Sequence, residues 1–234
     1  MNNTKMQDIA SRVVYEDNHI IIVNKLPGEL VQGDKTGDTT LADKVKLYLK
    51  EKYNKPGNVF LGVTHRLDRP VRGLVMYAKT SKALSRLNEM FKKGGVHKTY
   101  LAITENAPQT PEGLLVNYLK KNEKQNKSYV YEKPVQGAKE AKLKYKVLGK
   151  SDRYYLIEVE LLTGRHHQIR AQLSHMGCTI KGDLKYGAKR SNKDGGIDLL
   201  AYKLEFVHPV KKEKMVFTAP FPQDKLWQYF KDIV

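Results

Sequence analysis

Hydrophobic and polar positions alternate along this 234-residue chain in a way that predicts more strands than helices. An apolar pair, a polar turn and a second apolar run over Val13 to Asn24 predict a β-hairpin near the start. Other segments either alternate apolar with polar residues or form a short apolar run, and both patterns are typical of strands. These predicted strands are Gly73–Ala78, Val96–Thr104, Ala141–Val147, Tyr154–Leu162, Leu199–Val207 and Met215–Ala219.

Four segments instead carry apolar residues at every third or fourth position, the spacing of a helix with one buried face. Leu41–Tyr53 follows Thr39 and Thr40, either of which can cap its start. Ser81–Lys93 can be capped by Thr80 or Ser81 and ends at two glycines. A third helix is predicted over Arg165–Met176, and a closing helix begins at Asp224. Because strands outnumber helices and rarely alternate with them, the predicted fold class is α+β, with a mixed, largely antiparallel sheet flanked by a few helices.

Charge adds information about partners. Lysine and arginine total 42 against 25 acidic residues, so the formal net charge is +17 and the pI is near 9.7. Such a surplus favours a polyanionic partner, since phosphate contacts release counterions. The alternative is a lysine-rich surface that is simply solvated. Charge alone does not decide between the two.

The surplus is concentrated between Lys120 and Lys150, where ten lysines face three glutamates, a local net charge of 10 − 3 = +7. Tyrosines interleaved with these lysines offer flat surfaces on which bases can stack. They are Tyr118, Tyr129, Tyr131 and Tyr145. The strand predicted over Ala141–Val147 has the pattern of an ordinary half-exposed strand, so its lysines should face solvent whether or not a polyanion binds there.

The cellular setting follows from what the sequence lacks. Cys178 is the single cysteine, so no internal disulfide can form and a reducing cytoplasm is expected. The densest apolar run near the start, Ile20 to Val23, is far shorter than the roughly 20 residues that span a bilayer. Met1 to Ala10 is polar and has no apolar export core. No membrane association is expected.

A first candidate site lies in the polar stretch from Gly62 to Gly73, where Asp68 stands between Arg66 and Arg69. Pro70 disfavours helix for the residue before it, so an extended or turning loop is expected. Neighbouring positive charge keeps a carboxylate ionised, and an ionised carboxylate can act as nucleophile or general base. A surface cluster of salt bridges would show the same spacing.

A second candidate is Leu161 to Arg170, where a strand runs through Gly164 into a helix start bearing two arginines and two histidines. Backbone N–H groups at a helix start attract anions. His166 and His167 should point about 100° apart on a helix of roughly 3.6 residues per turn, which argues against a metal site. A capped helix with a basic first turn is the simpler interpretation.

The sequence does not match the signature motifs of other enzyme classes. Gly177 to Asp183 has the two-glycine spacing of a phosphate loop, but Asp183 stands where that loop needs lysine. Neither the nucleophile elbow of hydrolases nor the glycine pattern of dinucleotide-binding enzymes occurs. These absences argue against hydrolases of that type and dehydrogenases, and no cofactor is predicted.

Several motifs taken together point to one known family. His65-Arg66-Leu67-Asp68, followed by Gly73 to Lys79, resembles the catalytic motif of the RluA family of pseudouridine synthases. Lys98 to Ala102 resembles its Lys-x-Tyr-x-Ala strand, and Leu162 to Arg170 its third motif. The matching stretches keep the family's order from about Val13 to Pro222.

The resemblance implies an enzyme with the pseudouridine synthase fold, which isomerises a specific uridine of structured ribosomal or transfer RNA to pseudouridine without cofactor or metal. It implies an N-terminal tail over residues 1–12 and a catalytic domain over 13–234, active as a monomer. The accessory N-terminal RNA-binding domain of longer members is not expected, so RNA affinity should come from the catalytic domain's own basic surface.

It also implies residue roles. Asp68 would act on the ribose as nucleophile or base, Arg170 would pair with Asp68, and Tyr100 would stack on the uracil. Arg66 would fill the gap left by the flipped-out uridine, whose extrusion costs a few kcal/mol. The other implied substrate contacts are His65, Arg165, Gln168 and Lys98.

Two other classes stay open. One is a non-catalytic RNA-binding or ribosome-assembly protein on the same fold, which would need no matched set of Asp68, Tyr100 and Arg170. The other is a metal-dependent nuclease using Asp68, Asp183 and the histidines, but the sequence offers no clustered carboxylates for it.

Overall fold

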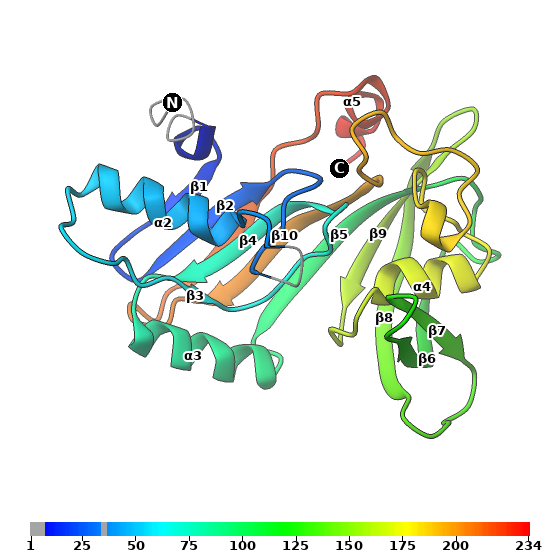
Figure 1. Ribbon diagram of the computed structural model, residues 1–234. Coiled ribbons are helices and arrows are strands. Elements are labelled where there is room, and N and C mark those ends of the chain that lie inside the picture. Colours follow the sequence, from blue (N-terminus) through cyan, green and yellow to red (C-terminus); the bar gives the residue numbers. More distant parts are fainter. Residues whose placement is uncertain (1–7, 34–36) are drawn as a thin grey trace. The chain divides into compact units, whose positions relative to one another are not determined.

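The computed structural model describes residues 8–33 and 37–234, and these form two compact units (Figure 1). The first unit consists of the chain up to Val96 together with Lys203–Pro220. The second consists of His97–Tyr202 together with Phe221–Val234. Strand β10 (Leu199–Val207) carries the chain from the second unit back into the first.

Antiparallel strands make up the sheet of the first unit. The predicted hairpin is confirmed, since β1 pairs with β2, and β2 pairs in turn with β4. The short strand β3 also pairs with β4, and β10 forms a hairpin with β11. The strands are β1 (Val13–Glu16), β2 (Ile20–Lys25), β3 (Gly62–Val63), β4 (Arg72–Ala78) and β11 (Lys214–Thr218).

Two capped helices accompany this sheet, as predicted. Helix α2 (Leu41–Lys52) starts at Thr40, which forms a reciprocal capping box with Asp43. Helix α3 (Ser81–Lys92) starts at Thr80, whose side chain accepts from the Ala83 N–H. The apolar side chains of β2 and β4 are fully buried and form the core of the unit.

The second unit is a five-stranded antiparallel arrangement in the order β5-β9-β8-β6-β7. Two of these strands, β6 and β7, lie outside the predicted elements. In β6 the run Leu114-Leu115-Val116 obscures the alternation, and Leu114 and Val116 are exposed. The strands are β5 (Val96–Thr104), β6 (Glu112–Asn122), β7 (Lys127–Tyr131), β8 (Lys139–Lys150) and β9 (Tyr155–Leu161). The helices are α4 (Gln168–His175), the short 3₁₀ helix η1 (Leu184–Tyr186) and α5 (Lys225–Lys231). Together the two units confirm the α+β class.

Helix α4 corrects the predicted start at Arg165. It begins at Gln168, because His167 adopts a left-handed backbone with φ of 54° and separates a preceding turn from the helix. The two adjacent histidines therefore do not diverge as they would on a helix. The rings of His166 and His167 stack with their centroids 3.8 Å apart.

The alternating strand predicted over Ala141–Val147 lies within β8, and its lysines face solvent as expected. Leu143 is buried on the opposite face. The Lys142 ammonium lies 2.9 Å from Glu140, and that of Lys144 lies 3.5 Å from Glu160. These carboxylates reduce the positive charge that the strand presents.

Of the tail predicted over residues 1–12, only residues 8–12 are among those described. Ile9 is buried, and the Arg12 guanidinium lies 2.7 Å from Glu29. In the described part of the chain, no helix is both long and apolar enough to cross a membrane.

Candidate active site

Asp68 lies in a turn between β3 and β4, and the buried Lys25 side chain holds the backbone of this turn through hydrogen bonds. The Lys25 ammonium donates to the carbonyl oxygens of Leu26 (3.1 Å), Asp68 (3.2 Å), Arg69 (3.0 Å) and Val71 (2.6 Å). Within the turn, the Val71 N–H donates to the Asp68 carbonyl over 3.0 Å. The backbone that carries the carboxylate is therefore fixed by a strand far away in the sequence.

Further contacts tie down the flanks of this turn. The His65 Nε2 accepts from the Met76 N–H of β4 over 3.1 Å, which orients the residue three positions before Asp68. Arg69 and Gly28 exchange hydrogen bonds: the Gly28 N–H donates to the Arg69 carbonyl, and Arg69 Nε donates to the Gly28 carbonyl. Such support pre-organises a site, because the reactive group needs no reordering when substrate arrives.

Burial changes the pKa of the Lys25 ammonium. Desolvation lowers the pKa of its ammonium to about 7, against the opposing effect of the Glu29 and Asp68 charges and with a further lowering by Arg72 and Arg69. Only the charged form has three N–H groups to share among the four carbonyls. This role of Lys25 was not predicted from the sequence.

Replacing Lys25 with Met should loosen the Asp68 turn, because buried carbonyls lose their donor. We expect the free energy of unfolding to fall by about 1–3 kcal/mol. Turnover of RNA should fall more than RNA affinity, since the carboxylate loses its position. Denaturant titration and single-turnover rates measure the two effects. The exposed Lys50→Met on α2 is the matched control. Wild-type stability and turnover in Lys25→Met would rule out this role.

In the second unit, Arg170 forms a bidentate ion pair with Asp183. Arg170 Nε and Nη2 donate to the two carboxylate oxygens over 2.7 and 2.9 Å. The two side chains are 4% and 1% exposed, so the pair lies in the interior of the unit. The pairing of Asp183 with Arg170 was not predicted from the sequence.

An aromatic and histidine cluster surrounds this pair. The Arg170 guanidinium lies over the Tyr186 ring, 5.1 Å from its centroid. The Tyr186 hydroxyl lies 3.0 Å from His167 Nδ1 and accepts from the Ser128 N–H over 2.9 Å. His166 stacks on His167 and lies 2.9 Å from the Ser128 hydroxyl. The left-handed backbone at His167 is thus held by side-chain contacts on both sides.

Burial, followed by the Arg170 charge, lowers the pKa of His167 to about 2, so the folded protein keeps it neutral. The unfolded chain takes up a proton there below about pH 6.5. The free energy of unfolding should therefore have its full value above pH 6.5 and decrease at lower pH, by about 1.4 kcal/mol for each pH unit. The total loss at pH 5 should be about 2 kcal/mol. Denaturant titration between pH 5 and 7.5 measures this slope.

His167→Asn should flatten the slope, since asparagine tolerates a left-handed backbone and does not titrate. His208, whose pKa burial also lowers, should leave a smaller slope of the same sign. Substitution of the exposed His97 by Asn should leave the profile unchanged. An undiminished slope in His167→Asn would assign the effect to other groups.

The turn before α4 is organised by Gln168. Its side-chain oxygen accepts from the Arg165 N–H (3.0 Å) and from the Thr163 hydroxyl (2.8 Å), while its Nε2 donates to the Lys142 carbonyl (3.0 Å). Arg165 Nε donates to the Glu140 carbonyl over 2.8 Å. The Arg165 N–H is therefore already used within the protein. Substrate contact by Gln168 and Arg165 stays a prediction.

Tyr100 and Lys98 lie on β5. Tyr100 is buried and pairs with Val159 of β9. Burial lowers the pKa of the Lys98 ammonium, which would lie 3.6 Å from a Cβ placed on Gly164. The structure thus brings Lys98 to the turn that carries Arg165 and Gln168. It groups His65, exposed Arg66 and Asp68 on one loop of the first unit. Asp68 belongs to the first unit and Arg170 to the second, and their pairing stays a prediction.

Across residues 8–33 and 37–234, no group of three or more His, Cys, Asp or Glu side chains is placed to hold a metal ion. The arrangement that a metal-dependent nuclease would need is therefore not found in the described chain. What the first unit presents is a single half-buried carboxylate on a firmly held turn between two arginines.

Comparisons with known proteins agree with the motifs. The family model described as RNA pseudouridylate synthase matches residues 19–175. The RNA pseudouridine synthase YhcT of Bacillus subtilis is 32% identical over 219 residues, which cover 91% of this chain and 69% of that protein. The ribosomal large subunit pseudouridine synthase C of Buchnera aphidicola is 30% identical, covering 93% of this chain and 70% of the relative.

A solved structure shares the fold. The human RNA pseudouridylate synthase domain containing 4 superposes with a TM-score of 0.80 at 22% identity, over 97% of this chain and 94% of the human one. At this identity the likeness concerns the fold alone, and it confirms the predicted pseudouridine synthase fold. From the family match and the relatives above 30% identity, the chain belongs to the RNA pseudouridylate synthase family and is an RNA-modifying isomerase.

Proposed function

We propose that this pseudouridine synthase modifies a specific uridine of ribosomal RNA, with the large subunit as the leading target and Asp68 as the catalytic carboxylate. The observation that carries the proposal is the Asp68 turn, whose backbone carbonyl oxygens accept hydrogen bonds from the Lys25 ammonium. The target is supported by relatives named ribosomal large subunit pseudouridine synthases C and D, 28–32% identical to this chain. Transfer RNA is the other candidate target.

The reaction needs a charged, positioned carboxylate and little else. The bond between ribose C1′ and uracil N1 breaks, the base turns, and C1′ forms a bond to uracil C5. The C5 proton leaves and N1 gains a proton, so atoms balance without oxidant or reductant. Asp68 acts at the ribose, as nucleophile or as base, and its fixed backbone limits the reorganisation that the step requires.

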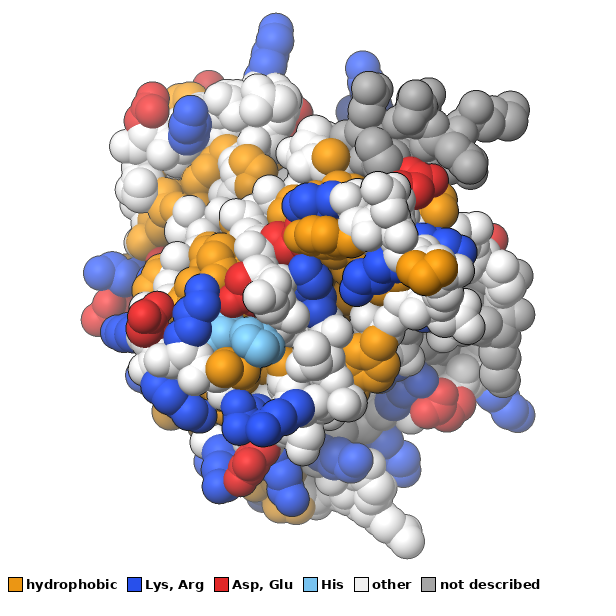
Figure 2. Space-filling view, turned by 90° about the vertical axis from the view of Figure 1, so that its left-hand side faces the viewer, with side chains coloured by type: hydrophobic (Ala, Val, Ile, Leu, Met, Phe, Trp, Pro, Cys, Tyr) orange, Lys and Arg blue, Asp and Glu red, His pale blue; other side chains and the backbone are white. Residues whose placement is uncertain are grey.

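Other roles follow from the family motifs. Arg66, exposed two residues before Asp68, would fill the space vacated by the flipped uridine. In the second unit, Tyr100 is proposed as the contact to uracil and Arg170 as an ionic partner of Asp68. Basic side chains are spread over the face in Figure 2 and gather in its lower part. Such a surface can hold RNA phosphates without reading sequence. A cytoplasmic location accords with this substrate.

Mapping pseudouridines in total RNA from cells with and without the gene tests the target. We expect one or a few positions in large-subunit ribosomal RNA to lose the modification and regain it when the wild-type gene returns. Loss confined to transfer RNA would replace the proposed target by the other. Unchanged maps of both RNA classes would contradict the proposed substrate.

A further inference from the structure

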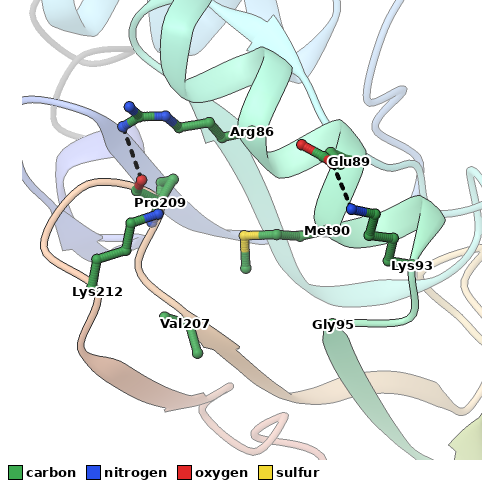
Figure 3. A pocket seen from close by; sticks show the side chains of 8 residues that line it. All are labelled: Arg86, Glu89, Met90, Lys93, Gly95, Val207, Pro209 and Lys212. Carbon is green, nitrogen blue, oxygen red and sulfur yellow. Dashed lines mark hydrogen bonds and ion pairs between the residues drawn. The ribbon is translucent and has the colours of Figure 1, made fainter.

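The pocket in Figure 3 lies in the first unit, between the second half of α3 and the turn that joins β10 to β11. Its volume is about 420 Å³, within the range of roughly 300–1,000 Å³ typical of small-ligand sites. None of its lining residues belongs to the Asp68 turn. They are Arg86, Glu89, Met90, Lys93, Gly95, Val207, Pro209 and Lys212.

One end of the pocket carries two positive charges that no carboxylate of the described residues neutralises. Arg86 gives one donor, Nη1, to the Pro209 carbonyl over 3.0 Å, and Figure 3 shows its guanidinium at the same end as the Lys212 side chain. Neither Arg86 nor Lys212 has a carboxylate partner among the described residues. By contrast, Lys93 is neutralised by Glu89 at 2.7 Å. The lining carries three cations and one anion, a net charge of 3 − 1 = +2.

Between the charged groups lies an apolar surface. The Met90 side chain points into the middle of the pocket, opposite Val207, which is 44% exposed. Pro209 adds a further apolar wall beside Arg86. Exposed apolar surface next to unpaired cations suits a ligand that has both an anionic group and a flat apolar face. A nucleotide has both, since its phosphate is anionic and its base is flat.

The backbone of Lys212 supports a role for its side chain. Lys212 has φ of 65°, in the left-handed region where glycine or asparagine is the usual choice. Its N–H donates to the His208 carbonyl, and the His208 N–H donates to the Glu213 carbonyl, so the turn is closed. The closed turn therefore holds Lys212 in this conformation, with its side chain in the lining of the pocket.

Helix α3 connects the pocket to the Asp68 loop. Met90 lines the pocket, while its neighbour Phe91 packs on His65, with ring centroids 5.2 Å apart. A helix with its side chains is about 10–12 Å across. Because adjacent residues of a helix point about 100° apart, the pocket and the His65 end of the loop lie on neighbouring faces of α3. They are within about one helix diameter of each other, a span that a few nucleotides of an RNA strand can cover.

We propose that this pocket is a second RNA-binding site, which binds one nucleotide of the substrate strand a few positions away from the modified uridine. Arg86 and Lys212 hold its phosphate, and Met90 with Val207 contacts its base. The inference rests on the RNA-modifying activity of the family. The pocket adds affinity outside the Asp68 turn and takes no part in bond making or breaking.

The test uses the full-length protein and a fluorescein-labelled single-stranded 12-nucleotide oligouridylate as the binding probe. In Arg86→Gln/Lys212→Gln the dissociation constant should rise about tenfold at low salt. The slope of log affinity against log salt should become shallower by about 0.7 for each phosphate that the variant no longer neutralises. With unmodified large-subunit ribosomal RNA as substrate, the effect should appear as a higher KM with an unchanged kcat.

Met90→Trp is the second variant, because it fills the pocket without changing charge and leaves the Arg86–Pro209 hydrogen bond in place. It should weaken probe binding with an unchanged salt slope. The charge-matched control is Lys225→Gln/Lys231→Gln on α5 in the other unit, where weaker effects of both kinds are expected.

Equally weakened binding in the pocket variant and this control would overturn the proposal in favour of general charge. Wild-type RNA binding, together with abolished binding of polyglutamate, would overturn it in favour of an acidic protein partner. Asp68→Asn separates this inference from the proposed function, since it tests turnover while leaving the pocket intact.

Discussion

Replacing Asp68 with Asn should abolish pseudouridine formation while leaving the fold and RNA affinity nearly unchanged. The substitution removes the charge and nucleophilicity of the carboxylate but keeps its shape, and the hydrogen bonds of the turn are accepted by the Asp68 backbone carbonyl. Loss of a nucleophile or its activating carboxylate costs about 10³-fold or more in other enzymes. Release of tritium from C5-labelled uridine in large-subunit ribosomal RNA measures turnover.

The exposed Asp152→Asn is the control for the loss of one negative charge, and it should turn over like the wild type. Asp68→Asn should still unfold in one cooperative thermal transition, which identifies a folded protein. Substantial residual turnover in a folded Asp68→Asn protein would mean that another group carries the chemistry.

Replacing Arg170 with Ala should destabilise the second unit by about 3–5 kcal/mol. The substitution leaves the Asp183 carboxylate, which is 1% exposed, without its bidentate partner in the interior. It also removes the cation over the Tyr186 ring. Denaturant titration followed by Trp227 fluorescence reports this unit, because Trp227 is buried within it.

Arg170→Lys should recover only part of the stability, since an ammonium cannot present two parallel donors to the carboxylate. Arg170→Ala/Asp183→Ala should be less damaging than the sum of the single changes, because no buried charge is left alone. The exposed Arg190→Ala is the control for loss of an arginine. Wild-type stability of Arg170→Ala would contradict a structural role for the pair.

Most of the secondary structure could be predicted from local patterns. Helices α2 and α3 begin at the threonines that the sequence offers as caps, because a cap needs only neighbouring residues. The hairpin of β1 and β2 and the alternation of β8 also follow from local periodicity. Strand β6 could not be found this way, since its exposed Leu114 and Val116 break the expected pattern.

The start of α4 shows how distant contacts override local spacing. The sequence predicts that the helix starts at Arg165, but the Gln168 side chain accepts from the Arg165 N–H and also reaches β8. His167 takes a left-handed backbone beside the Tyr186 hydroxyl. A hydrogen bond to a residue 19 positions away has no signature in the local pattern.

By itself the sequence determined the α+β class, the family and the identity of the proposed catalytic carboxylate, because these depend on motifs of adjacent residues and on their order. The partners of the site residues were decided only by tertiary structure. Lys25 meets the Asp68 carbonyl across 43 positions, and Arg170 meets Asp183 across 13. Periodicity tells which face of an element is buried, whereas packing decides which polar groups meet there, because each buried donor and acceptor must find a partner within reach.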